Sequence, residues 1–286
     1  MKTTRLRLTA ACAALALAAV GCGDDGDDVS TPDTKPTFAA GSTMEKIQKA
    51  GVLKVGTKFD QPLYGEKQIN GDITGFDVEI AKIVAKAIGV KAEFQEAVSK
   101  NREPFIKAGT VDIVVATYTI NDKRKLEVSF AGPYYQTGQS ILVKDDNTDI
   151  TKKEDLAGKR VCSVEGSTPA ENVKKLVPTA KLTLLAAYGE CVEGMKNDQI
   201  DAVTTDEAIL LGLVSKNTDF KMKVVGEQFS EEPYGIGLAK DDKAFRDFIN
   251  DAIEKAVADG TYKAAYDATV GKVAPEMPAP PTIVRY

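Results

Sequence analysis

We predict an α/β protein with two units, each a mainly parallel sheet with helices on both faces, from three observations. The chain has 286 residues, of which 43 % are hydrophobic, enough to bury two cores. Strand-like and helix-like segments alternate along it, which is typical of βαβ units. This alternation starts near Val52 and starts again at Arg160. Ligands of such folds bind at the carboxyl ends of the strands, so a binding site is expected there.

The first unit opens with a predicted strand at 52–57 and a predicted helix at 75–89. Apolar residues three and four apart give this helix one buried face, and Gly89 ends it. The residues of that face are Val78, Ala81, Val84 and Ile88. Two further strands are expected at 90–94 and 111–116, which completes a strand–helix–strand pattern.

The second unit repeats the pattern, with strands at 160–164, near 182–186 and at 202–204. Its helix is predicted to begin at Pro169. Residues 168–171 fit a capping box in which Thr168 is the cap and proline takes the first helical position. The free N–H groups and positive dipole end of a helix amino terminus suit a carboxylate.

The composition excludes several kinds of function. A net charge of −5 argues against nucleic-acid binding, because phosphate neutralisation needs a concentrated basic surface. The chain contains no histidine, which excludes Ser-His-Asp and Cys-His catalysis and histidine-containing zinc sites. We expect neither a metal nor a cofactor.

The first residues have the pattern of an export signal. Lys2, Arg5 and Arg7 precede an apolar run at 8–20 that is too short for a permanent membrane span. The run ends in small residues before Cys22 and resembles a bacterial lipoprotein signal, although Ala19 stands where that pattern usually has leucine. We predict a lipoprotein signal peptide at 1–21 and lipidation of Cys22. The alternative is ordinary signal cleavage with Cys22 incidental.

Residues 22–42 are small, acidic and proline-containing, so we predict a flexible, solvated tether. An anchor and a tether would place the folded part at the outer face of the cytoplasmic membrane. Because that compartment is oxidising, Cys162 and Cys191 are candidates for a structural disulfide. Closing a loop of about 30 residues would stabilise the fold by roughly 3.5 kcal/mol in the chain-entropy model.

Short strings in the rest of the chain resemble the polar amino-acid family of extracellular solute-binding proteins, which serve ATP-driven (ABC) importers. The resemblance covers residues 45–275. The strings are Gly51 to Thr57, Thr74 to Val78, Ala116 to Arg124, Phe130 to Tyr135, Asp155 to Lys159, Gly166 to Thr168, Asp201 to Val203 and Glu232 to Gly237. The stretch from Cys162 to Pro169, with Cys191, resembles the glutamate-binding branch found in actinobacteria.

The resemblance implies a clamshell with two lobes, like a periplasmic binding protein. Lobe 1 would comprise 45–137 plus 236–275, and lobe 2 would comprise 138–235. Two hinge crossings, near 136–142 and 234–238, would connect them, and a ligand that touches both lobes would favour closure. The segment 276–286 would be an extended tail. We expect a monomer that works with the permease subunits of a transporter.

A zwitterionic ligand needs a carboxylate clamp and an ammonium acceptor. Arg124 matches the family's carboxylate-binding arginine and can donate parallel hydrogen bonds; from composition alone it would be one charge in a solvated run. Thr117 and Thr119 correspond to positions that offer carbonyl or hydroxyl groups to the ligand. Ser167 and Thr168 would close lobe 2 onto the same carboxylate. Asp206 matches the acid that receives the ammonium group, and its alternative role is a helix cap.

The side-chain selector is predicted from Lys58, whose position in the family faces the ligand side chain. A cation there can pair with an acidic side chain, which a neutral amide would leave desolvated and unpaired. Arg102 would supply a second positive contact or hold the rim, and Gln61 and Tyr118 would shape the pocket. The alternative for Lys58 and Arg102 is a solvated surface charge. Glutamate is therefore the first predicted ligand, aspartate the second, and glutamine follows.

Two other classes of function stay open. The same fold carries cleft enzymes, such as dehydratases and lyases, that use a buried carboxylic acid. Because no histidine is present and the ligand-clamp strings are intact, we expect a binding protein that is not an enzyme. A sensory module without a transporter is the other alternative, since the sequence does not mark the partner surface.

Overall fold

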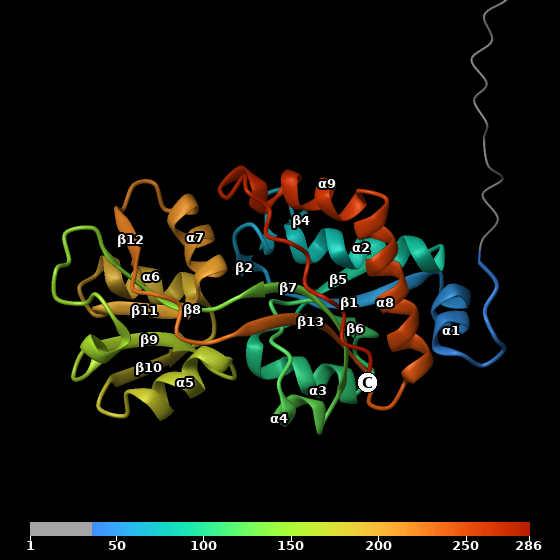
Figure 1. The fold of residues 1–286 in the computed structure, drawn as a ribbon, viewed down its shortest axis with the longest axis horizontal. Helices are drawn as coiled ribbons and strands as arrows, with labels where there is room; N and C mark the ends of the chain where they lie inside the picture. The colour runs from blue at the N-terminus through green and yellow to red at the C-terminus, as the bar shows by residue number, and fades with distance from the viewer. Residues whose placement is uncertain (1–35) are drawn as a thin grey trace, which may run out of the picture. The chain divides into compact units, whose positions relative to one another are not determined.

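The computed structural model of the chain describes residues 36–286, which contain two five-stranded sheets and one three-stranded sheet (Figure 1). We call the part built on the first five-stranded sheet lobe 1 and the part built on the second lobe 2. The predicted signal peptide at 1–21, Cys22 and the predicted tether as far as residue 35 lie outside the described residues. No helix within 36–286 is long and apolar enough to cross a membrane.

The sheet of lobe 1 has the strand order β5-β1-β6-β13-β7. Strand β1 runs parallel to β5 and β6, whereas β13 runs antiparallel to β6 and β7. Four strands therefore share one direction, and β13, which returns from lobe 2, opposes them. The strands are β1 Val52–Thr57, β5 Lys91–Glu96, β6 Ile113–Val114, β7 Ser129–Thr137 and β13 Glu232–Leu238.

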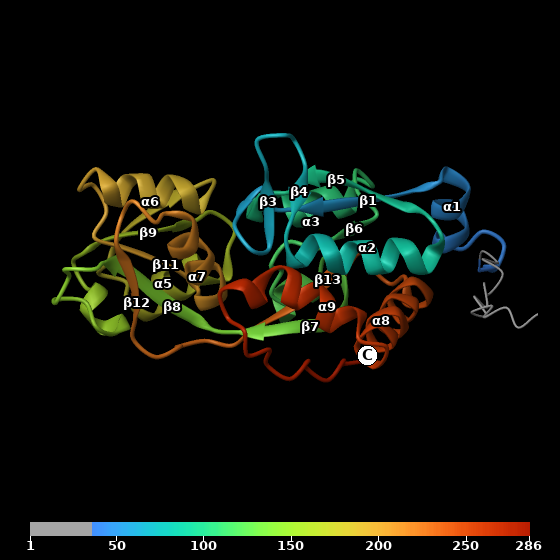
Figure 2. The ribbon, with the colours of Figure 1, turned by 90° about the horizontal axis from the view of Figure 1, so that it is seen from above.

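Helices cover both faces of this sheet (Figure 1, Figure 2). One face carries α1 Thr43–Ala50, α2 Phe76–Ile88, α8 Lys243–Ala258 and α9 Thr261–Ala268, and the other carries α3 Arg102–Lys107 and α4 Asp122–Lys125. The small sheet, beside lobe 2, consists of β2 Asp60–Gln61, β3 Gly65–Lys67 and β4 Ile73–Thr74. Single 3-10 turns occur at η1 Ser99–Asn101 and η3 Val270–Lys272.

Lobe 2 repeats this plan with the strand order β10-β9-β11-β8-β12. Strand β9 is parallel to β10 and β11, and β8, which enters from lobe 1, is antiparallel to β11 and β12. The strands are β8 Gln139–Lys144, β9 Arg160–Val164, β10 Lys181–Leu185, β11 Ala202–Asp206 and β12 Met222–Val225. The helices are η2 Lys153–Leu156, α5 Thr168–Leu176, α6 Tyr188–Lys196 and α7 Glu207–Lys216. The predicted α/β fold class is confirmed.

The helix predicted at 75–89 forms as α2, and all four residues of its predicted apolar face are fully buried. Gly89 ends it in the left-handed conformation, with φ +83°, which glycine adopts without strain. The strand predicted at 111–116 is shorter, because only Ile113 and Val114 pair in β6. After that point the chain leaves the sheet towards the space between the lobes.

The chain passes between the two sheets twice. The first passage is at Gly138, between β7 and β8, within the predicted crossing at 136–142. The second is made by 226–231, between β12 and β13, whereas the sequence placed it at 234–238. The difference arises because the apolar string that starts at Glu232 already belongs to the sheet of lobe 1.

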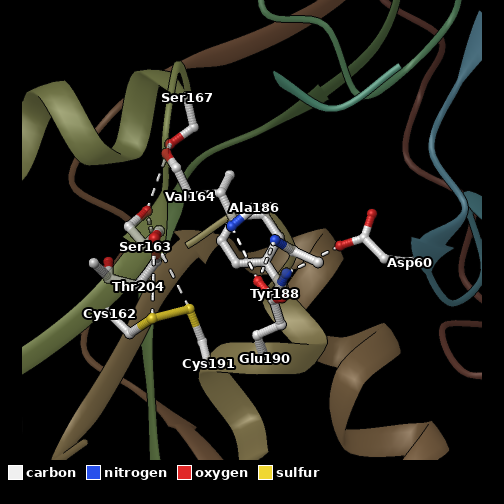
Figure 3. The surroundings of a disulfide bond; sticks show 11 residues. Asp60, Cys162, Ser163, Val164, Ser167, Ala186, Tyr188, Glu190, Cys191 and Thr204 are labelled. Carbon is white, nitrogen blue, oxygen red and sulfur yellow. Dashed lines mark hydrogen bonds between the residues drawn. A yellow bond between two sulfur atoms is a disulfide. The ribbon is translucent and has the colours of Figure 1, made fainter. Parts of the chain in front are cut away.

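Cys162 of β9 and Cys191 of α6 form the predicted disulfide within lobe 2 (Figure 3). Both ends of the described chain pack on lobe 1. Phe38, in the predicted tether, stacks edge-on against Phe248, with ring centroids 5.4 Å apart. The 276–286 segment has no helix or strand, and the Val284 N–H donates to the carbonyl of Gly132.

Candidate functional site

A small cavity of about 10 Å³, room for roughly one water molecule, lies between the two lobes. Lobe 1 lines it with Gln61, Ser99, Arg102, Thr117 and Thr119, and lobe 2 lines it with Ser167, Thr168, Pro169, Tyr188, Asp206 and Ile209. Seven of the ten ligand-binding residues predicted from the sequence are in this lining. The other three, Lys58, Tyr118 and Arg124, approach it from behind or from the side.

Arg124 joins the two lobes at the side of the cavity. It is only 7 % exposed, although Asp122 and Lys123 beside it on α4 are exposed, so it is not part of a solvated run. Its Nη1 donates to the carbonyl of Thr119 at 2.7 Å and to Thr168 Oγ1 at 3.0 Å. Its Nε lies 3.2 Å from a carboxylate oxygen of Glu103. Burial lowers the pKa of Arg124 to about 10, so it remains charged at neutral pH.

Arg102 is a second buried guanidinium, and its hydrogen bonds go to backbone carbonyls alone. It is 2 % exposed and donates to the carbonyls of Ser99, Ala116, Thr117 and, across the lobes, Gly166. Within the described residues it forms no ion pair. Its positive charge is therefore held in the cavity wall without an acidic partner.

Tyr118 lies beneath both arginines and does not line the cavity, which corrects the prediction that it shapes the pocket. The guanidinium carbons of Arg102 and Arg124 lie 4.3 and 5.0 Å from its ring centroid. Its ring also packs edge-on against Phe130 in the core of lobe 1. Tyr118 therefore supports the two cations through cation–π contacts.

Lys58 is 1 % exposed, which excludes a solvated surface charge. Its Nζ donates to Ser99 Oγ at 2.8 Å, and Ser99 lines the cavity whereas Lys58 does not. The ammonium group thus lies one hydrogen bond behind the wall, further from the ligand than the sequence predicted. The pKa of Lys58 is lowered from 10.5 to about 7, mainly by burial. The positive charges of Arg102 and Arg124 lower this pKa further, whereas the negative charge of Asp60 raises it.

Asp206 ends β11 and occupies the capping position of α7, but its side chain caps no backbone N–H. Its Oδ2 accepts a hydrogen bond from the Tyr234 hydroxyl at 2.6 Å, and its Oδ1 is buried without a partner. The helix-cap alternative is therefore wrong for this side chain. Burial, followed by the charge of Glu232, raises the pKa of Asp206 to about 8.

Ser167 is the cap of α5, which corrects the prediction that Thr168 caps it. The backbone of Ser167 is extended, and its Oγ accepts from the N–H of Ala170 at 3.1 Å. The helix starts one residue earlier than predicted, so Thr168 is its first residue. This leaves the Thr168 hydroxyl free to accept the hydrogen bond from Arg124 across the cleft.

Sequence reasoning missed Asp77, which supports the cavity from inside lobe 1. It is fully buried and accepts from the Thr117 N–H at 2.7 Å and from the Tyr134 hydroxyl at 2.6 Å. This holds Thr117 at φ +42°, and the Thr117 hydroxyl in turn donates to Gln61 Oε1. The available signal was a carboxylate within the first turn of an otherwise apolar helix face.

The lobes also touch around the rim of the cavity. Asp60 of lobe 1 accepts from the N–H of Tyr188, the first residue of α6 (Figure 3). An anionic side chain at that end of the helix is favoured by the helix dipole. A Cβ on Gly166 would come within 2.7 Å of Lys100, and one on Gly212 within 2.4 Å of the Pro62 carbonyl. The absence of side chains at these two glycines lets the lobes meet.

The arrangement has the complementary charges that a free amino acid needs. Lys58, Arg102 and Arg124 are three buried cations at or beside the cavity, and within residues 36–286 only Arg124 has a contacting acidic partner. Asp206 lines the same cavity, and one of its carboxylate oxygens has no hydrogen-bond partner among the described residues. The cavity wall and the groups beside it therefore carry charges complementary to a carboxylate and to an ammonium group.

Residues 53–272 match the family described as bacterial extracellular solute-binding proteins, family 3. The chain is 37 % identical over 286 residues to the glutamate-binding protein GluB of Corynebacterium glutamicum, covering 95 % of this chain and 92 % of that protein. It is also 37 % identical over 270 residues to the glutamine-binding protein GlnH of Bacillus subtilis, covering 93 % and 96 %.

A solved structure of an ancestral arginine-binding protein bound to glutamine is similar in fold. Its TM-score is 0.74 at 40 % identity, and the match covers 77 % of this chain and 98 % of that one. These relatives are named for binding different amino acids, so likeness alone leaves the ligand open.

Proposed function

Because this chain belongs to the bacterial extracellular solute-binding proteins of family 3, we propose that it captures glutamate, with aspartate second, for an ABC importer. Proteins of this family bind amino acids and deliver them to such transporters. The proposed mechanism is capture between the lobes and presentation to the permease, with no bond made or broken.

The observation that carries the choice of glutamate is the pair of cations without acidic partners. Lys58 and Arg102 are buried, and within the described part of the chain they donate hydrogen bonds only to neutral groups. A buried charge without a counterion is costly, and a ligand carboxylate near it would offset that cost. Glutamate brings a second carboxylate, whereas glutamine leaves these cations unneutralised and arginine adds a further positive charge.

Each part of the ligand has a proposed partner. The α-carboxylate would bind Arg124, with Thr168 and the amino end of α5 closing from lobe 2. The ammonium group would bind Asp206. The side-chain carboxylate would lie near Arg102 and the Ser99 hydroxyl, with Lys58 behind it.

Glutamine is the second candidate ligand. GlnH of Bacillus subtilis is as similar to this chain as GluB, and the similar ancestral structure is bound to glutamine. A Lys58 ammonium group whose pKa is lowered to about 7 can also become neutral, which reduces the cost of a neutral side chain beside it.

The proposed location is the outer face of the cytoplasmic membrane. It rests on the sequence pattern at 1–22, with Cys22 as the lipidated residue, and on a family described as extracellular. A sensory role and cleft-enzyme chemistry remain the alternatives; the curated relatives reported above are named as binding proteins, which supports binding without turnover.

Calorimetric titration tests the proposal. The protein is unfolded, dialysed and refolded to remove bound ligand, and then titrated with glutamate, aspartate, glutamine and arginine. Tight glutamate binding and much weaker glutamine binding would support the proposal. Tighter glutamine than glutamate binding would overturn the role of the cations, and binding of none of the four would overturn the function.

A further inference from the structure

Glu232 is a buried acid that the proposed ligand contacts leave unused. It is the first residue of β13, where the chain returns from lobe 2, and its exposure is 0 %. Its Oε2 accepts from the Thr119 hydroxyl at 2.6 Å, and its Oε1 accepts from Ser230 at 2.8 Å and from Asn172 at 3.4 Å. Within the described residues it forms no ion pair. A fully buried carboxylate held only by neutral donors is uncommon.

Glu232 and Asp206 are linked through Thr119 and Tyr234, whose backbones pair with each other. Glu232 and Tyr234 are two residues apart on β13, so their side chains leave the strand on the same face. Tyr234 donates to Asp206, whereas Glu232 holds Thr119, and both Asp206 and Thr119 line the cavity. Asp206 therefore lines the cavity directly, from β11, whereas Glu232, on β13, is linked to the cavity wall through Thr119.

The positive charges that face this pair, those of Arg102 and Arg124, both come from lobe 1. Burial and the neighbouring negative charge raise the pKa of Asp206, and burial raises that of Glu232. The positive charges of Arg102 and Arg124 oppose both shifts, as do the hydrogen bonds from Tyr234 to Asp206 and from Thr119 and Ser230 to Glu232. Two buried acids that repel each other take up a proton more readily than either would alone.

We propose that Asp206 and Glu232 together form the ammonium acceptor of the cleft, and that this pair holds one proton when the cleft is empty and releases it when an amino acid binds. The ligand ammonium keeps its own protons and replaces the lost positive charge, and the released proton passes to the solvent. Asp206 contacts the ammonium through its unpartnered oxygen. Glu232 is a positioning residue that orients Thr119 and supplies the second negative charge. This inference rests on the proposed amino-acid-binding function.

The test is calorimetry at pH 7 with glutamate, repeated in buffers of different ionisation enthalpy, which counts the protons exchanged on binding. Lys58 also titrates near pH 7, but it contributes equally to the wild type and to a variant at 232. We expect Glu232→Gln to release fewer protons than the wild type, by half a proton or more. Glu231→Gln, which removes an exposed acid one residue away, should match the wild type.

The pH dependence of affinity is a second measurement, and substitution of Glu232 would not change it if the role of Glu232 were only structural. If binding releases a proton, affinity rises with pH and becomes constant above the apparent pKa of the group that loses the proton. The pH at which affinity becomes constant therefore reports the apparent pKa of the Asp206–Glu232 pair. Glu232→Gln should lower that pH, whereas Thr119→Val, which removes a donor to Glu232, should raise it. If Glu232→Gln does not fold, the Thr119→Val shift decides.

The outcomes separate the two proposals. Glutamate binding with equal proton release in the wild type and Glu232→Gln, or with no shift in Thr119→Val, would overturn the shared acceptor and leave the glutamate proposal intact. Failure of every amino acid to bind would overturn both.

Discussion

Replacing Gly212 by alanine should separate lobe closure from the stability of the fold. Gly212 lies within α7, and a Cβ there would come within 2.4 Å of the Pro62 carbonyl oxygen in lobe 1. Ordinary contact begins at 3.4 Å, so the lobes must move apart by about 1 Å. The added methyl group therefore acts on the closed arrangement, and it contacts none of the residues that we propose to bind the ligand.

The two expected effects have opposite signs. Overpacking of this kind costs about 1–3 kcal/mol, and here it falls on the closed state alone. Affinity for every amino acid should therefore fall by roughly 5- to 150-fold, with the ratio between ligands unchanged. Alanine is also preferred to glycine within a helix by about 0.5–1 kcal/mol, so the ligand-free protein should melt at a slightly higher temperature.

Titration calorimetry and thermal unfolding measure the two effects, with Gly189→Ala as the matched control. Gly189 lies within α6, and a Cβ there would meet nothing within 4 Å. The control should raise the melting temperature and leave affinity within about twofold, a change below 0.5 kcal/mol. Unchanged affinity in Gly212→Ala would show that the contact between α7 and Pro62 is not part of the ligand-bound state.

Three further substitutions or treatments address the site and its support. Arg124→Ala should abolish detectable binding of every amino acid in calorimetry; retained binding of any would refute its role as the carboxylate clamp. Asp77→Asn leaves one of its two donors without an acceptor and should lower the free energy of unfolding in urea by about 1–3 kcal/mol; an unchanged value would mean the contacts carry no stability. Reducing the Cys162–Cys191 bond should lower the free energy of unfolding by roughly 3.5 kcal/mol and change affinity much less; a larger loss of affinity than of stability would contradict this.

Local pattern was sufficient to predict most of the fold. In α2, the helical spacing of apolar residues predicts the buried face, and Gly89 predicts where the helix ends. Tertiary contacts change neither. Strand β9 forms over the predicted 160–164. The predicted strand at 111–116 is shorter in the structure, where only Ile113 and Val114 pair in β6 and the chain soon reaches Thr117, which lines the cavity.

The site was predicted less completely, since burial and partners depend on segments far apart in the chain. Thr168 has the composition of a cap, but Ser167 has the extended backbone and takes that role. Asp77 and Glu232 resemble ordinary helix and strand residues in the sequence. Asp77 and Thr117 are 40 residues apart in the sequence, and Glu232 and Thr119 are 113 residues apart. Only the fold brings each pair into contact.

The central claim is that buried cations make the cleft prefer an acidic side chain, and the affinity ratio of glutamate to glutamine tests it most directly. The ratio is measured by calorimetry from pH 6 to pH 9 in the wild type and in Lys58→Gln. Burial lowers the pKa of Lys58 to about 7. The Lys58 side chain is therefore positively charged and attracts the ligand carboxylate below that pH, and it becomes neutral above it.

We predict a wild-type ratio well above one at pH 6 that falls as the pH rises through 7. In Lys58→Gln we predict a much lower ratio at pH 6 that stays constant over this range, because affinity is lost for glutamate alone. Equal losses for glutamate and glutamine in Lys58→Gln, or a wild-type ratio that does not change with pH, would contradict the claim.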